Sequence, residues 1–155
     1  MRFPKKIRLP ESLYQEEGRV CLITICARNR ELIFGNVALG LACVDLLKTC
    51  AENRGITIYV YCFMPDHVHL LLAPSAGGDV IGFVRGFKGA STRLAWRFGI
   101  GPRLWQRSFY DHFLRREEVL ENTAQYILNN PVRKGMVERY QDYPLAGSWA
   151  LQLDL

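Results

Sequence analysis

The sequence predicts an α+β fold of the split βαβ, ferredoxin-like kind: a four-stranded antiparallel sheet with two helices on one face, followed by a third helix and a tail. Two observations predict it. Short β-branched runs alternate with longer segments of helical period in the order β-α-β-β-α-β-α. The runs 56–63 and 67–73 are joined by only a tight polar connection, which is typical of an antiparallel hairpin.

The first half of the chain supplies one strand and one helix before the hairpin. Residues 20–26 form a short, apolar, β-branched run, which predicts the first strand. Asn36 is placed to cap a helix that begins at Val37, and Gly55 is placed just past its end, where glycine tolerates a left-handed backbone. The two strands of the hairpin follow.

The second half is expected to contain a basic helix, a fourth strand and a third helix. Asp79 is placed to cap a helix over 80–98 that has an apolar stripe at helical spacing. A fourth strand is expected over 104–114, broken near Ser108. A third helix is expected over 117–130, ended by Pro131, and the remainder should pack over the domain with little regular structure.

Length and composition limit the class of protein. The 155 residues suit one domain over 1–155, with a basic arm at 1–17 and a tail at 131–155. The net charge of +5 favours an anionic partner. No run approaches the ~18 apolar residues of a membrane span, and the five cysteines contain no Cys-x-x-Cys pair. We expect a cytoplasmic monomer or homodimer with no membrane partner.

Two of the three histidines lie in the run MPDHVHLLL at the start of the third strand. Side chains alternate along a strand, so His67 and His69 share a face while Val68 points to the other. Two imidazoles fixed side by side can hold one divalent cation. The alternative is two polar residues on a solvated strand face.

A second candidate group lies on the third helix. Tyr126 and Asn130 are four residues apart, so they lie on one helix face. An Asn130 oxygen could complete a metal site with the two imidazoles, with Tyr126 one turn away. A metal beside a tyrosine and a basic surface suits phosphoryl transfer. The alternative for Tyr126 is an ordinary position on an amphipathic helix.

Six segments of the chain follow a known order: 24–34 (TICARNRELIF), 61–72 (YCFMPDHVHLLL), 87–91 (FKGAS), 105–115 (WQRSFYDHFLR), 126–135 (YILNNPVRKG) and 143–148 (YPLAGS). In these segments the chain resembles the REP-associated tyrosine transposases, within the HUH single-strand DNA nucleases that carry one catalytic tyrosine. The resemblance implies that His67 and His69 are metal ligands, that Tyr126 is the nucleophile and that Asn130 is the candidate third ligand. Many members have Asn before the first histidine, where this chain has Asp66, whose role stays open.

The resemblance implies a metal-dependent endonuclease and strand transferase that acts on single-stranded or hairpin DNA, with Mg or Mn, through a 5′-phosphotyrosine. Imidazole ligands by themselves would equally suit Zn. The alternatives are a non-catalytic nucleic-acid-binding module on the same fold and a Zn hydrolase that forms no adduct. DNA contacts are expected at Arg85, Lys88, Arg93, Arg97, Trp105, Tyr110, Arg115, Arg133 and Lys134.

Several of these expected DNA contacts have a structural alternative. Trp105 and Tyr110 can stack on unpaired bases or pack into the core. The basic residues of the second helix can equally be a solvated helix face. The third histidine, His112, is expected to contact DNA or to be a partly buried polar residue.

Overall fold

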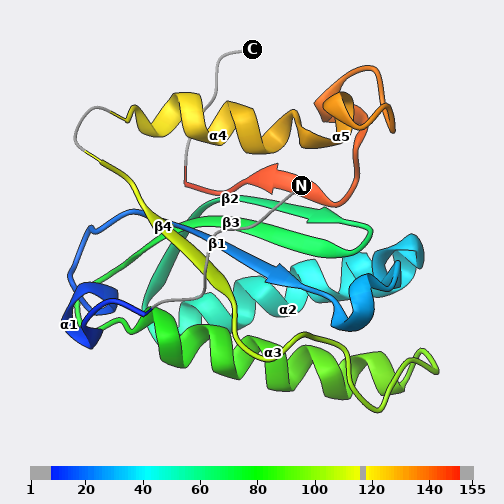
Figure 1. Ribbon diagram of the computed structural model, residues 1–155, viewed down its shortest axis with the longest axis horizontal. Helices are drawn as coiled ribbons and strands as arrows, with labels where there is room; N and C mark the ends of the chain where they lie inside the picture. The colour runs from blue at the N-terminus through cyan, green and yellow to red at the C-terminus, as the bar shows by residue number, and fades with distance from the viewer. Residues whose placement is uncertain (1–7, 116–117, 151–155) are drawn as a thin grey trace.

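The computed structural model describes residues 8–115 and 118–150 and shows one antiparallel sheet between two helical layers (Figure 1). The strand order is β4-β1-β3-β2-β5. Helices α2 and α3 cover one face of the sheet, and α4 lies over the other (Figure 1). The strands are β1 (Cys21–Cys26), β2 (Ile56–Met64), β3 (His67–Pro74), β4 (Tyr110–Phe113) and β5 (Ala146–Ser148); the α-helices are α1 (Glu11–Tyr14), α2 (Val37–Arg54), α3 (Val80–Trp96), α4 (Leu120–Leu128) and α5 (Asn130–Arg133).

The predicted fold class is confirmed, since the order β4-β1-β3-β2 with α2 and α3 on one face is the ferredoxin-like arrangement. The sheet has one strand more than predicted. β5 lies in the tail, at the outer edge of β2, where Cys62 pairs with Ala146 and Val60 with Ser148. The tail is therefore more regular than the sequence indicated.

The helix caps follow the sequence prediction. The Asn36 side chain accepts a hydrogen bond from the Leu39 amide at 3.1 Å, and Asp79 accepts one from the Ile81 amide at 3.2 Å. Gly55 follows α2 with a left-handed φ of 65°. These residues fix where each helix of the lower layer begins and ends.

Two predicted elements are divided differently in the structure. The expected strand over 104–114 is regular only at β4, after a break at Ser108, whose φ is +82°. The expected third helix begins at Leu120, although Glu117 lies outside the described residues. It ends at Leu128, and α5 starts at Asn130 with Pro131 in its first turn. Proline suits a first helical turn because that position needs no N–H donor, so Pro131 opens a helix here.

The main core fills the space between the sheet and the lower helices. Val68, Leu70 and Leu72 of β3 are fully buried there, and Phe83 of α3 stacks on Phe87 with ring centroids 6.4 Å apart. Among the described residues, no helix is long and apolar enough to cross a membrane.

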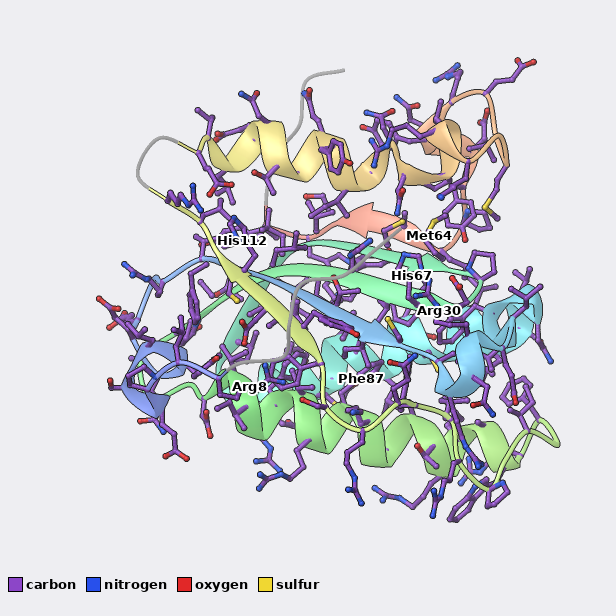
Figure 2. The ribbon with its side chains drawn as sticks, in the orientation of Figure 1. Arg8, Arg30, Met64, His67, Phe87 and His112 are labelled. Atoms are coloured by element: carbon purple, nitrogen blue, oxygen red, sulfur yellow. The ribbon has the colours of Figure 1, made fainter. Side chains whose placement is uncertain are left out.

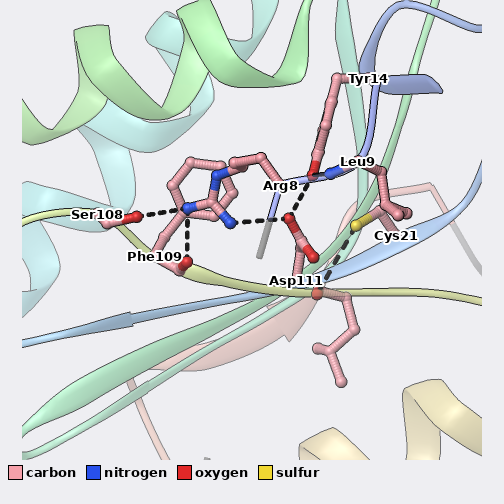
Figure 3. Close-up of polar contacts among 8 residues, drawn as sticks. Arg8, Leu9, Tyr14, Cys21, Ser108, Phe109 and Asp111 are labelled. Carbon is pink, nitrogen blue, oxygen red and sulfur yellow. Dashed lines mark hydrogen bonds and ion pairs between the residues drawn. The ribbon is translucent and has the colours of Figure 1, made fainter. Parts of the chain in front are cut away.

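The described part of the N-terminal arm is fastened to β4 (Figure 3). Arg8 donates to the Asp111 carboxylate at 3.0 Å and to the carbonyl oxygen of Phe109 at 2.6 Å, and its guanidinium lies 3.7 Å from the centre of the Phe109 ring. Tyr14 donates to the same Asp111 oxygen at 2.7 Å. A partly buried ion pair thus attaches the arm to the edge strand of the sheet.

Candidate active site

The histidine pair sits at the start of β3, in the middle of the sheet. Pairing with β1 places Thr24 beside His69, and pairing with β2 places Cys62 on its other side. His67 is 3% exposed and His69 is 9% exposed, so neither lies on a solvated strand face. The prediction that the two rings share a face is confirmed by their Nε2 atoms, which lie 3.2 Å apart.

Each ring is also held at its other nitrogen. His67 Nδ1 lies 2.7 Å from Asp66 Oδ1, and His69 Nδ1 lies 2.9 Å from the Thr24 hydroxyl. An ionised carboxylate only accepts, so His67 Nδ1 carries the proton and its Nε2 offers a lone pair. When His69 likewise donates from Nδ1 to Thr24, two lone pairs face each other, which is an arrangement that a shared cation satisfies.

The separation of the two nitrogens fits that interpretation. Two nitrogens bound at ~2.1 Å to one ion are about 3.0 Å apart at an octahedral right angle and about 3.4 Å apart at a tetrahedral angle. The observed 3.2 Å lies between these values. Oxygen partners at the outer nitrogens of ligating histidines fix the tautomer and ring orientation in metal sites. The pair therefore has both the spacing and the supports of two ligands to one ion.

The electrostatics keep both rings neutral. Burial, together with smaller effects of the neighbouring His67 and Arg133, lowers the pKa of His69 to about 3. Burial also lowers the pKa of His67, against an opposing effect of Asp66. For Asp66, burial raises the pKa, but the hydrogen bonds from His67 and Arg30 outweigh burial and leave its pKa below the usual range. Neutral imidazoles beside an ionised carboxylate are the protonation states that metal binding needs.

The other predicted residues approach from α4 and α5. Asn130 is 5% exposed, and its Oδ1 accepts a hydrogen bond from Arg133 Nη2 at 3.3 Å. The Arg133 guanidinium also lies 3.7 Å from the centre of the Tyr126 ring. Tyr126 itself is 64% exposed. One guanidinium thus contacts both the predicted nucleophile and the predicted amide ligand, and its charge acts on His69.

A hollow of about 390 Å³ opens beside the pair. Its lining includes His67, Asp66 and Arg30 from the sheet side and Lys134 and Met136 from the segment after α5. Figure 2 shows Arg30 and His67 close together at this end of the sheet. Within residues 8–115 and 118–150, no group of three or more His, Cys, Asp or Glu side chains gathers to hold a metal. An oxygen ligand such as Asn130 therefore stays the predicted third donor.

Most of the remaining predicted DNA contacts lie elsewhere. Arg85, Arg93 and Arg97 belong to α3 and the residue after it, on the opposite side of the sheet from α4, and all three are exposed. Lys88 donates to the carbonyl oxygens of Gln106 and Ser108, each at 2.7 Å, so its ammonium already has protein partners.

The rest divide between the sheet and the edge of the molecule. Tyr110 is half-buried on β4, paired with Thr24 and thus on the histidine face of the sheet. Arg115 is exposed just beyond β4. His112 is exposed and bonded to Glu118 at 2.9 Å, far from His67 in Figure 2.

Trp105 requires a correction. It is 8% exposed, its ring packs 5.7 Å from Phe34 and 6.1 Å from Phe87, and its Nε1 donates to the Ser91 hydroxyl at 2.9 Å. A ring enclosed in this way offers no face to a base. Trp105 is a core residue, which is the alternative that the sequence left open, and we no longer include it among the DNA contacts.

The sequence reasoning missed two supports of the site, Thr24 and Arg30. Arg30 donates from Nε to Asp66 Oδ2 at 2.9 Å. It lies in an unusual turn in which both Asn29 and Arg30 have positive φ. No spacing along the chain links either residue to the histidines. Only the pairing of β1 with β3 brings Thr24 to the site.

The chain is similar to known proteins. Residues 19–130, most of the chain, match the family of IS200-like transposases. The chain belongs to this family. It is 39% identical to the ISDra2 transposase TnpA of Deinococcus radiodurans over 105 residues, which cover 66% of this chain and 74% of that protein.

The chain is also similar to REP-associated tyrosine transposases. The REP-associated tyrosine transposase of Escherichia coli is 23% identical over 133 residues, covering 86% of this chain and 78% of that one. A solved structure of a REP-associated tyrosine transposase bound to a REP hairpin superposes with a TM-score of 0.72 at 22% identity, covering 92% of this chain and 82% of that one. The structural likeness supports the fold, and the match over residues 19–130 supports membership of the IS200-like family.

Proposed function

We propose that this IS200-like transposase is a metal-dependent, single-strand DNA endonuclease and strand transferase. The observation that carries the proposal is the pair of facing Nε2 atoms of His67 and His69, 3.2 Å apart, each ring held from behind by an oxygen. A non-catalytic binding module gives no reason for two buried, neutral imidazoles whose Nε2 atoms face one another, whereas one shared cation does so when both rings carry their proton on Nδ1.

The ligand set of the proposal is His67, His69 and Asn130, with Mg or Mn as the ion. When bound, the ion would polarise the scissile phosphate and stabilise the charge that develops on it. The amide oxygen of Asn130 suits Mg or Mn, whereas the two imidazoles alone suit Zn, Cu, Fe or Ni. Asn130 would reach the ion by exchanging its contact with Arg133, whose guanidinium is then available for a phosphate oxygen.

Tyr126 is the proposed nucleophile. Its hydroxyl oxygen attacks the phosphorus and loses its proton, a tyrosine–phosphate ester forms, and the bond from phosphorus to the 3′ oxygen breaks. The 3′ oxygen takes a proton and leaves as a hydroxyl, so the protein stays joined to a 5′ phosphate. The exposure of Tyr126 leaves it accessible to a strand, and Arg133 over its ring keeps it beside the predicted amide ligand.

The proposed substrate is DNA with a hairpin next to the cleaved strand. The support is the structural neighbour that is bound to a REP hairpin, together with the net charge of +5. Exposed Lys134, which follows α5, and Arg133 would contact phosphates near the cleaved bond.

The test is the covalent adduct. Wild-type protein, a hairpin oligonucleotide labelled at one end or the other, and Mn should give a protein–DNA band on a denaturing gel that carries only the 5′-phosphate side. Tyr126→Phe should remove the band and leave DNA binding intact. Tyr110→Phe is the variant of the competing tyrosine, because Tyr110 of β4 also lies on the histidine face of the sheet, and it should still form the adduct. An adduct that persists in Tyr126→Phe and is lost in Tyr110→Phe would overturn the assignment, and cleavage with no adduct at all would favour a hydrolase.

A further inference from the structure

The excess of positive over negative charge in the protein lies in one segment. Residues 80–110 contain six Lys or Arg and no Asp or Glu. Because the whole chain carries +5 and this segment carries +6, the rest of the chain has a net charge of −1. The six cations are Arg85, Lys88, Arg93, Arg97, Arg103 and Arg107.

This segment folds into one layer. It comprises α3 and the chain that returns along it to β4, on the side of the sheet away from α4 (Figure 1). Lys88 fastens the two together through its hydrogen bonds to Gln106 and Ser108. The cations are therefore presented on a surface separate from the hollow beside the histidines.

Two hollows lie along α3 and the returning chain, and Lys88 lines both; together they are called the basic groove. One is a hollow of about 430 Å³ whose lining includes Arg8, Arg85, Arg107 and Phe109. The other is a hollow of about 390 Å³ whose lining includes Arg93, Arg103 and Trp96. Each hollow thus has a cation from α3, a cation from the returning chain and an aromatic ring in its lining.

Trp96 is exposed yet held in place. It is 55% exposed, while its Nε1 donates to the carbonyl oxygen of Pro102 at 2.9 Å. Gly101 lies so close that a Cβ there would come within 2.5 Å of the indole ring. A ring fixed in this way has already lost its rotamer freedom, so a ligand that stacks on it pays little further ordering entropy.

We propose that this groove binds single-stranded DNA, with its cations on the phosphates and Trp96 stacked on an unpaired base. Basic grooves that carry exposed aromatic rings bind single strands in this manner, because every base has a stacking face. The ligand class rests on the proposed function, but the site is a second one, across the sheet from the histidines. It would hold the strand that flanks a hairpin while the scissile bond lies at the metal.

Binding without catalysis tests the proposal. In EDTA, fluorescence anisotropy would follow a labelled thymidine oligonucleotide of about 12 residues, within the ~4–16 nucleotides typical of one single-strand site. Trp96→Leu should weaken binding about 5- to 100-fold, and Trp96→Phe should retain most of the affinity. Trp149→Leu is the matched control, since Trp149 is 36% exposed but packs on Tyr61 of β2, outside the basic layer. It should bind as the wild type does.

Two further measurements keep the result unambiguous. Arg103→Gln, a change at an exposed side chain, should weaken binding and reduce its salt dependence, whether or not Trp96→Leu folds normally. Blunt duplex of the same length should lose much less affinity than single strand in Trp96→Leu. Equal losses for single strand and duplex, an equal loss in Trp149→Leu, unchanged binding in both Trp96→Leu and Arg103→Gln, or tighter binding of the matching RNA would each overturn the proposal.

The outcome is independent of cleavage. The same titrations in a Tyr126→Phe background should give the same differences, because Trp96 and Tyr126 lie in layers on opposite sides of the sheet. A protein that shows the Trp96 effect but forms no adduct would retain this site and lose the proposed catalysis. A protein that forms the adduct but shows no Trp96 effect would retain the catalysis and lose this site.

Discussion

The hydroxyl of Thr24 lies 2.9 Å from Nδ1 of His69, although the two residues are 45 positions apart in the chain. The antiparallel pairing of β1 with β3 creates this contact. It fixes the orientation of the buried ring and leaves Nε2 facing His67. Thr24 therefore acts on the proposed ion through His69.

Thr24→Val should raise the concentration of Mn needed for half-maximal cleavage. The valine keeps the shape of the side chain but removes the oxygen that orients the ring, and losses of such partners commonly weaken metal sites about 10- to 100-fold. Saturating Mn should restore much of the rate. Thr57→Val is the control, because the Thr57 hydroxyl bonds Ser75 at the far end of the hairpin. A Mn requirement that shifts equally in both variants would show a general effect on the sheet.

His67→Ala and His69→Ala should each abolish cleavage in Mn while DNA binding largely survives. Cleavage depends on one ion, whereas binding rests on many phosphate contacts. His112→Ala should cleave normally, because that ring is exposed and bonded to Glu118. Gel assays of cleavage and anisotropy of binding on the same preparations separate the two activities. Normal cleavage by either single variant of the pair means that the ion binds elsewhere.

The metal-free protein should lose stability as the pH falls below about 6.5. The folded-state pKa of His69 is lowered to about 3, so between these values the unfolded chain binds a proton that the folded chain does not. The loss should approach ~1.4 kcal/mol per pH unit for this one group. Asp66 acts in the same direction at lower pH, because its stabilisation is lost as the pH falls through its lowered folded-state pKa.

Urea unfolding in EDTA, from pH ~7 to pH ~5, measures this effect through the linkage of stability to proton binding. His69→Gln should show a shallower dependence on pH than the wild type, whatever its stability at neutral pH. Parallel curves for the two proteins would mean that the ring is protonated in the fold.

Lys88→Gln should mainly lower stability, which revises the expectation from sequence that Lys88 is simply a phosphate contact. The change removes two charge-assisted bonds to Gln106 and Ser108, each worth roughly 1.5–3 kcal/mol. Arg85→Gln, at an exposed position on the same helix, should leave stability unchanged and lower the slope of affinity against salt by about one. Thermal unfolding and salt titrations of both variants check the contrast. Equal stability of the two variants would contradict the structural role of Lys88.

Asp111→Asn should destabilise the protein by about 2 kcal/mol, because the Asp111 carboxylate accepts from both Arg8 and Tyr14 and is only 9% exposed. Urea unfolding measures the loss. Asp142→Asn, at an exposed position, is the control. If Asp111→Asn is as stable as the wild type, the arm contributes little to the fold.

The sequence predicted what depends on local chemistry. Caps at Asn36 and Asp79, the left-handed turn at Gly55 and the shared face of the two histidines all follow from residue types within a few positions. The ferredoxin-like class followed from the order of these elements along the chain.

The features that could not be predicted from the sequence depend on which elements become neighbours in the fold. Trp96 and Trp105 look alike in the sequence, yet the turn at 99–102 leaves one ring at the surface and packs the other against Phe34 and Phe87. Thr24 has no signal at all before β1 is paired with β3. The three residues of β5 are too few for periodicity to reveal a strand.

The break between α4 and α5 places the proposed nucleophile and the proposed amide ligand on different helices. Tyr126 and Asn130 belong to different helices, separated by the single residue Asn129. Asn130 is buried, whereas Tyr126 is exposed and its ring contacts the Arg133 guanidinium. Ala124, Ile127 and Leu128 hold the opposite face of α4 in the core. In the proposed reaction, a DNA end joined to Tyr126 would therefore lie on the outer surface of α4, while the proposed ligand stays buried at the start of α5.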